Sequence, residues 1–187
     1  MEIRNRPGGP LDVDARGGSI TMAAWVFNKG VAGPIFNYNP RGRGVRLWFI
    51  TPKTLFVGLS MRGRRRRFTG TLATRQNIRF GWNFVAATYR RRTGRARLFV
   101  NNKFVARKRI GRIRLATNFD VRLGAVSGDR RYFRGMIACA QFFSKALSAR
   151  QLRYRSKKCF RGKDKRELEL NPLRARWPME PALISGF

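Results

Sequence analysis

The chemistry that this sequence offers is that of the guanidinium group. Arg and Lys together account for 42 of the 187 residues, against nine Asp and Glu, so the formal net charge is +33. Arginine supplies 33 of those cations. Its planar fork binds sulfate, phosphate or carboxylate groups through paired hydrogen bonds. The excess of arginine therefore predicts recognition of anions rather than solubility alone.

The basic residues gather in a stretch that has no counterions of its own. No acid lies between Asp14 and Asp120, although 24 Arg or Lys fall there, so counterions must come from solvent, a partner or the few acids outside. One such cluster is equally explained as a solvated loop tip, but several clusters without a partner repel one another at a steady cost. We predict a polyanion-binding surface made of Arg62, Arg64, Arg65, Arg66, Arg67, Arg90, Arg91, Arg92, Arg95, Arg97, Arg107, Lys108, Arg109, Arg112, Arg114, Arg130, Arg131 and Arg134.

Aromatic residues accompany part of this set. Tyr132 and Phe133 adjoin its last three arginines and are suited to stacking a sugar or a base, although strand alternation would bury Phe133. Trp25, Trp48 and Trp82 fall within expected strands, and we predict that they belong to the core.

The composition argues against an enzyme. Histidine is absent, which removes Ser/His and Cys/His nucleophile pairs, an imidazole base near neutral pH and His-based zinc sites. With 43% hydrophobic residues and 15 Phe, the chain is also too apolar for a disordered basic tail. We expect a folded, non-enzymatic binding protein with no cofactor and no metal.

Strands must position these side chains. From Ser19 onward, short apolar-rich stretches alternate with turn residues every 8–12 positions or so, which is typical of an all-β antiparallel sandwich. The pair Asn101-Asn102 suits a tight hairpin turn, and one short helix is expected from Ser148 to Tyr154. Strands are expected at residues 19–27, 33–38, 45–50, 54–59, 81–89, 95–100 and 103–107.

The chain divides into three parts by composition. Residues 1–18 contain Pro-Gly-rich turns and are expected to form an irregular lead-in, and residues 19–159 form the body. Residues 160–187 carry four of the nine acids and are expected to form an irregular tail. No stretch approaches the ~20 apolar residues that a membrane span needs.

A series of motifs in the body resembles a known family. Residues 19–26 resemble an opening strand, residues 82–89 a central W-N-x-V-A-x-T-Y strand, and residues 97–103 an L-Y-V-N-G-K hairpin. Residues 133–141 and 144–148 resemble a closing strand and its K-A-L-S turn. In this order the motifs are similar to the laminin-G-like or concanavalin-like jelly rolls, which include the pentraxins. The resemblance covers residues 19–159 and implies a jelly roll of two antiparallel sheets.

The resemblance also carries expectations about sites. In secreted invertebrate members a cysteine of the closing strand pairs with one about twenty residues on, which implies a Cys139–Cys159 disulfide and an oxidising compartment. Secretion implies that a signal peptide has been removed. Calcium-binding members supply several loop carboxylates, whereas Asp120 and Asp129 are too few here. The carboxylate-rich strand of the glycoside hydrolases of this fold is missing as well.

Three functions remain open at this point. The first is extracellular binding of a sulfated or acidic glycan, or of an acidic glycoprotein. The second is nucleic-acid binding or packing, which the charge favours but no nucleic-acid motif supports and which we expect to be non-specific. The third is structural assembly in a coat, shell or fibre, with an acidic protein partner or as a homo-oligomer whose tail acids dock on a neighbour's basic face. Those acids are Asp164, Glu167, Glu169 and Glu180.

Overall fold

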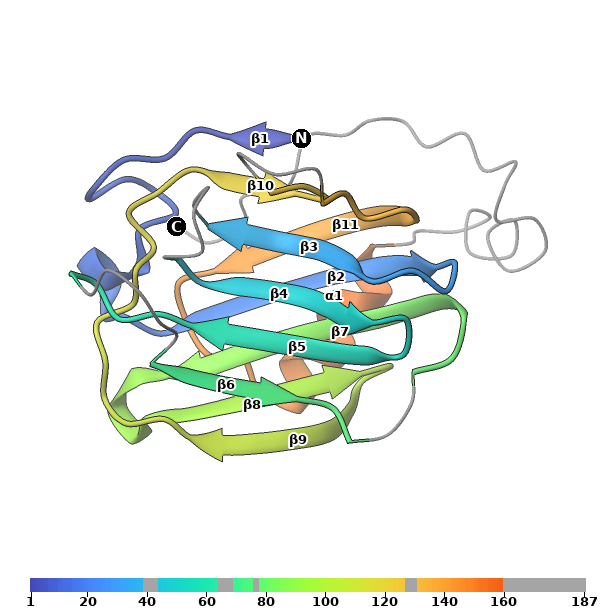
Figure 1. The fold of residues 1–187 in the computed structure, drawn as a ribbon. Coiled ribbons are helices and arrows are strands. Elements are labelled where there is room, and N and C mark those ends of the chain that lie inside the picture. The colour runs from blue at the N-terminus through green and yellow to red at the C-terminus, as the bar shows by residue number, and fades with distance from the viewer. Residues whose placement is uncertain (39–43, 64–68, 76–77, 127–130, 160–187) are drawn as a thin grey trace.

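A computed structural model describes residues 1–38, 44–63, 69–75, 78–126 and 131–159 and confirms the predicted sandwich (Figure 1). Two antiparallel sheets pack face to face, with one short helix near the end of the described chain. The six-stranded sheet has the spatial order β1 (Glu2–Ile3), β10 (Val121–Leu123), β3 (Gly33–Tyr38), β4 (Arg46–Thr51), β5 (Thr54–Leu59) and β6 (Gly70–Ala73). The five-stranded sheet has the order β11 (Met136–Phe143), β2 (Ile20–Asn28), β7 (Gly81–Arg90), β8 (Arg95–Val100) and β9 (Lys103–Arg109). The expected tail lies outside the described residues.

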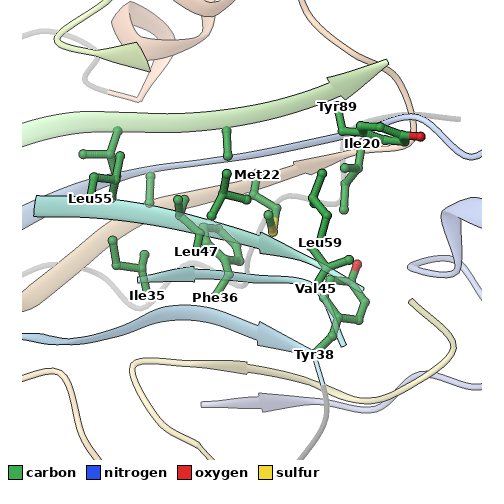
Figure 2. Packing of buried hydrophobic residues seen from close by; sticks show 14 of the residues in the cluster. Ile20, Met22, Ile35, Phe36, Tyr38, Val45, Leu47, Leu55, Leu59 and Tyr89 are labelled. Atoms are coloured by element: carbon green, nitrogen blue, oxygen red, sulfur yellow. The ribbon is translucent and has the colours of Figure 1, made fainter. Parts of the chain in front are cut away.

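The main hydrophobic core lies between the two sheets. Because side chains of a strand alternate between its faces, Ile20 and Met22 of β2 point inward together, and Leu47 of β4 faces them from the other sheet (Figure 2). Tyr38 and Tyr89 close this core at one end, and the Tyr38 hydroxyl donates a hydrogen bond to the Leu11 carbonyl oxygen at 3.0 Å. Alternating apolar residues therefore build the sandwich as the sequence predicts.

A second apolar layer covers the outer face of the five-stranded sheet. Helix α1 (Ala149–Lys158) packs Leu152 against Phe84 and Phe99, and the Trp25 Nε1 atom donates to the Ser156 carbonyl oxygen at 3.2 Å. The helix begins after Ser148, whose side chain caps it as predicted, but it extends four residues beyond the expected end.

The expected disulfide is present. Cys139 of β11 is bonded to Cys159, directly after the last residue of α1. The bond closes a segment with a sequence separation of 20 residues and fastens the helix to the sheet that it covers. This covalent link supports the small apolar layer beneath the helix.

The N-terminal residues contribute to the sandwich rather than only leading into it. Strand β1 pairs with β10, and Leu11 and Val13 belong to the main core. The Asn5 side chain donates to the carbonyl oxygens of Thr117 and Phe119, at 2.8 and 3.1 Å. The Val13 amide donates to the Thr117 hydroxyl at 3.1 Å, which holds a short 3-10 turn, Val13–Arg16, against the segment before β10. The boundaries expected at residues 18 and 159 stay predictions.

Candidate functional site

Five arginines of the predicted surface lie together on the outer face of the five-stranded sheet. They come from β7, β8 and β9, which are neighbouring strands at one side of that sheet (Figure 1). Arg95 lies opposite both Arg90 and Arg109 in register, and Arg97 lies opposite Arg107. Residues opposite one another project to the same face. We call this group the arginine array; its members are Arg90, Arg95, Arg97, Arg107 and Arg109.

The array faces solvent. Ala96 and Leu98, which alternate with Arg95 and Arg97 along β8, point into the core, so the arginines point outward. All five residues are exposed. Neighbouring strands lie about 4.8 Å apart, and alternate residues of one strand lie about 7 Å apart. The Cα atoms of the five arginines are therefore closely spaced on this face.

The positive charges of the arginine array repel one another when no anionic partner is bound. Like charges directly opposite one another on a sheet destabilise the pairing. Within the described part of the chain, no carboxylate forms an ion pair with any member of the array. An anion with several charged groups in a row would relieve this repulsion and bind through charge-assisted hydrogen bonds.

Three other predicted arginines converge instead on two buried acids. The Arg114 Nη2 atom lies 2.8 Å from Asp14 Oδ2. The Arg62 Nη1 atom lies between the two acids, 3.0 Å from Asp12 Oδ2 and 3.4 Å from Asp14 Oδ2. Arg91 approaches Asp14 at 3.8 Å. We call these five residues the aspartate hub. Arg62, Arg91 and Arg114 come from three separate basic runs of the sequence, at residues 62–67, 90–97 and 107–114. The acids that precede the acid-free stretch therefore supply part of its counterions.

Burial and hydrogen bonding together set the protonation of Asp12. Its side chain is 0% exposed, and burial alone would raise its pKa. The Gly8 amide and the Thr117 hydroxyl both donate to the carboxylate, at 2.9 and 3.0 Å. Together with the Arg62 charge, these bonds outweigh the burial and hold the pKa of Asp12 below its usual value. The hub therefore keeps a buried carboxylate charged.

We expect the fold to lose stability in acid because of Asp12. A carboxyl group whose pKa is lowered by folding stabilises the protein above its unfolded pKa, about 4, and this contribution is lost as the pH falls through the lower folded value. Thermal unfolding followed at pH values from neutral to about 3 measures the effect. An Asp12→Asn variant, compared with the surface change Glu2→Gln, should show a flatter dependence; an unchanged slope would contradict the role given to Asp12.

The remaining predicted residues lie in several places. Lys108 is opposite Ala96 in register and so projects to the face opposite the array. Arg92, in the 3-10 turn Arg91–Thr93, and Arg112 are exposed near the end of β8 that carries the array. Arg134 is exposed before β11. Outside the described residues lie Arg64, Arg65, Arg66, Arg67 and Arg130.

Trp48 is buried, as predicted, but it lies outside the main core between the two sheets. Its neighbours Leu47 and Phe49 point into the main core, so Trp48 lies on the outer face of the six-stranded sheet. It is only 6% exposed because guanidinium groups cover the indole: the Cζ atoms of Arg46 and Arg131 lie 4.9 and 4.8 Å from its ring centroid. Arg131 therefore covers an aromatic ring on the sheet opposite the array.

The other aromatic expectations are partly met. Phe133 is buried, as alternation predicts, and stacks on Phe49 with ring centroids 6.1 Å apart. Tyr132 remains 61% exposed. Trp25 lies beneath α1 on the outer face of the five-stranded sheet, and Trp82 is half-buried against the edge of Phe27. Asp12 and Asp14 were not predicted as site residues, because the arginines that hydrogen-bond to them lie 48 to 100 residues away in the sequence.

Two further observations bear on the kind of site. Across the described residues, no group of three or more Cys, Asp or Glu side chains is placed to hold a metal ion. None of the helices in that part of the chain has the length and apolar character needed to cross a membrane.

The two-sheet jelly roll with a helix on one outer face defines a lectin-like class of sandwich. Residues 9–153 match the Laminin_G_3 family, described as the concanavalin A-like lectin/glucanases superfamily. The chain belongs to this family. No curated protein matches the sequence.

Solved structures share the fold at low sequence identity. A proposed carbohydrate-binding protein from Bacteroides ovatus is 20% identical, with a TM-score of 0.57, over 73% of this chain and 40% of that one. A heptameric SAP-like pentraxin from Limulus polyphemus is 15% identical, with a TM-score of 0.53, over 72% of this chain and 68% of that one. The binding domain of botulinum neurotoxin DC, in complex with rat synaptotagmin II, is 12% identical, with a TM-score of 0.54, over 78% and 37%. The chain thus spans well under half the length of two of the three, and at these identities the likeness concerns the fold.

Proposed function

We propose that this protein binds polyanions, specifically sulfated or acidic glycans and the glycoproteins that carry them, through the arginine array. The observation that carries the proposal is the array itself: five exposed arginines on one sheet face, opposite one another in register. Guanidinium groups in this arrangement meet successive sulfate or carboxylate groups with paired hydrogen bonds. Binding releases counterions from the polyanion, so affinity falls as salt rises.

An exposed aromatic ring beside the array favours a glycan. Phe104 lies opposite Phe99 in register, on the same outer face, and is 51% exposed. Along β9 it precedes Arg107 on that face. A flat apolar ring next to guanidinium groups is suited to packing against a sugar ring whose acidic substituents contact the arginines.

The surroundings of the site support an extracellular, non-enzymatic role. The disulfide Cys139–Cys159 favours an oxidising compartment, as expected for a secreted protein of this family. Although the superfamily includes glucanases, glycoside hydrolysis uses two carboxyl groups flanking the scissile bond. In the described part of the chain Asp12 and Asp14 are buried in ion pairs, so they are poorly suited to that chemistry.

Nucleic-acid binding is the second candidate, because the array attracts any chain of phosphates. A comparison at matched salt separates the two. On heparin-agarose we expect elution above physiological salt, and we expect heparin to displace bound duplex DNA at equal charge concentration. Elution from heparin below physiological salt would contradict glycan binding, whereas tighter binding to DNA than to heparin would favour the nucleic-acid alternative.

A further inference from the structure

Exposed apolar side chains gather at the end of the sandwich that lies away from the aspartate hub. Seven large hydrophobic side chains are exposed among the described residues. Four of them occupy connections or strand ends at this end of the molecule, and they are 37 to 61% exposed. We call them the apolar tip; its members are Val31, Ile50, Phe80 and Tyr132.

Hydrogen bonds tie three of the connections at this end together. The Asn28 Nδ2 atom donates to the Pro52 carbonyl oxygen at 2.6 Å, which joins the end of β2 to the β4–β5 turn. The Ile78 amide donates to the Lys53 carbonyl oxygen at 2.9 Å, which joins that turn to the segment before β7. Phe80 follows in this segment, and its ring lies against Gly30, where a Cβ atom would come within 3.4 Å of it. These contacts hold the connections that carry Val31 and Phe80 against the β4–β5 turn.

Tyr132 and Ile50 extend the same end of the molecule. A Cβ atom on Gly33 would come within 2.8 Å of Phe133 Cα, so the start of β3 packs directly on the segment that carries Tyr132. Phe133 stacks on Phe49, which precedes Ile50 at the end of β4. The buried Phe133 thus anchors two exposed members of the tip.

The tip carries positive charge, whereas the described acids lie elsewhere. Lys29, Lys53 and Arg79 are exposed within the same connections, and the Lys53 Nζ atom lies 5.1 Å from the Phe80 ring centroid. Asp14 lies beside Arg91, just beyond the opposite end of the ten-residue strand β7, about 30 Å away.

The other described acids are also remote from the tip. Glu2 is opposite Arg122 in β10, and Asp120 precedes the residue of β10 that pairs with Tyr38. Tyr38 is the last residue of β3, whose first residue, Gly33, lies at the tip. Among the described residues, then, all four acids lie toward the end of the molecule opposite the tip.

We propose that the apolar tip docks on lipid bilayers with anionic headgroups. Apolar and aromatic side chains gain free energy at the boundary between headgroups and acyl chains, and each Lys or Arg near an anionic surface adds to the attraction. Long basic side chains keep their charged ends among the headgroups while apolar neighbours enter more deeply. A sulfated glycan offers charge and flat sugar faces that suit an aromatic ring, but no apolar layer for the aliphatic side chains of Val31 and Ile50. This surface is separate from the arginine array.

Co-sedimentation with vesicles tests the proposal. The full chain should bind vesicles of phosphatidylcholine containing about a third phosphatidylserine and should bind pure phosphatidylcholine far less. Replacing Lys29, Lys53 and Arg79 with Gln should lower the partition coefficient roughly a hundredfold, at about fivefold for each cation removed. Replacing Ile50 and Phe80 with Ser should lower it about tenfold or more, because exposed apolar area no longer enters the bilayer.

Control variants outside the apolar tip distinguish docking by the tip from a general attraction of the basic protein to anionic vesicles. Tyr154→Ser removes a comparably exposed ring on helix α1, outside both proposed surfaces, and should leave vesicle binding unchanged. Replacing the five arginines of the array with Gln should reduce heparin binding more than vesicle binding. Two results would overturn the proposal: vesicle binding that is insensitive to Ile50→Ser with Phe80→Ser, or tip variants that lose heparin binding while keeping vesicle binding, which would assign the tip to a glycan.

Discussion

Replacing the five arginines of the arginine array with glutamine is expected to abolish heparin binding at physiological salt. Each guanidinium group that contacts a charged group of the ligand releases counterions, at about 0.7 to 0.9 units of the log–log salt slope per contact on nucleic acids. If all five bind, the slope should fall by about four units. Heparin affinity measured at several salt concentrations gives both the loss and the slope.

The same variant should fold at least as stably as the original chain. Arg90, Arg95 and Arg109 lie side by side on three strands, and Arg97 faces Arg107. Like charges in such positions oppose strand pairing, and glutamine keeps much of the side-chain length without the charge. A thermal unfolding midpoint that stays the same or rises, together with lost heparin binding, would show that the array serves binding at some cost to stability.

A variant with equal charge separates the array from the net charge. The control replaces five exposed basic residues outside the five-stranded sheet with glutamine, namely Arg4, Arg6, Lys53, Arg75 and Arg79. This control lowers the net positive charge by the same five units, so the long-range attraction to heparin weakens and binding should fall modestly. Equal losses in the two variants would show that the total charge, rather than the array, governs binding.

The fold was predictable because it depends on local alternation. Runs such as Arg46-Leu47-Trp48-Phe49-Ile50 place every second side chain in the core, and the Asn101-Asn102 turn fixes one hairpin. The same alternation, applied strictly, places Trp48 outside beside Arg46. The prediction that Trp48 is buried is confirmed, but hydrophobicity alone did not reveal that it lies outside the main core, where Arg46 and Arg131 cover its ring.

For the candidate site, the sequence names candidate residues but does not give their arrangement. Arginine density indicated the surface, but only the register of β8 and β9 shows that Arg97 and Arg107 share a face while Lys108 does not. The bulge in the β8–β9 pairing adds a residue that changes which side chains align, and sequence gives little sign of it. Partners such as Asp14 and Arg114, 100 residues apart, meet only through the tertiary fold.

Asp14→Asn is expected to destabilise the protein by about 3 kcal/mol, or roughly 10 °C in the unfolding midpoint. The Asp14 side chain is 3% exposed and lies within 4 Å of three guanidinium groups, those of Arg62, Arg91 and Arg114. Without its charge these cations repel one another at a place where the N-terminal segment must pack. Chemical or thermal unfolding at neutral pH measures the loss.

Glu2→Gln supplies the comparison, because it removes one negative charge from a surface pair with Arg122 at 2.8 Å and should cost only about 0.5 kcal/mol. Adding Arg114→Gln to Asp14→Asn should restore part of the lost stability, because the second change removes a positive charge that repels Arg62 and Arg91. Arg114 is chosen because it is the most exposed of the three hub arginines. Strictly additive effects in the double variant would mean that the hub stabilises the fold through packing, and that its acids do not act as the counterions of the basic clusters.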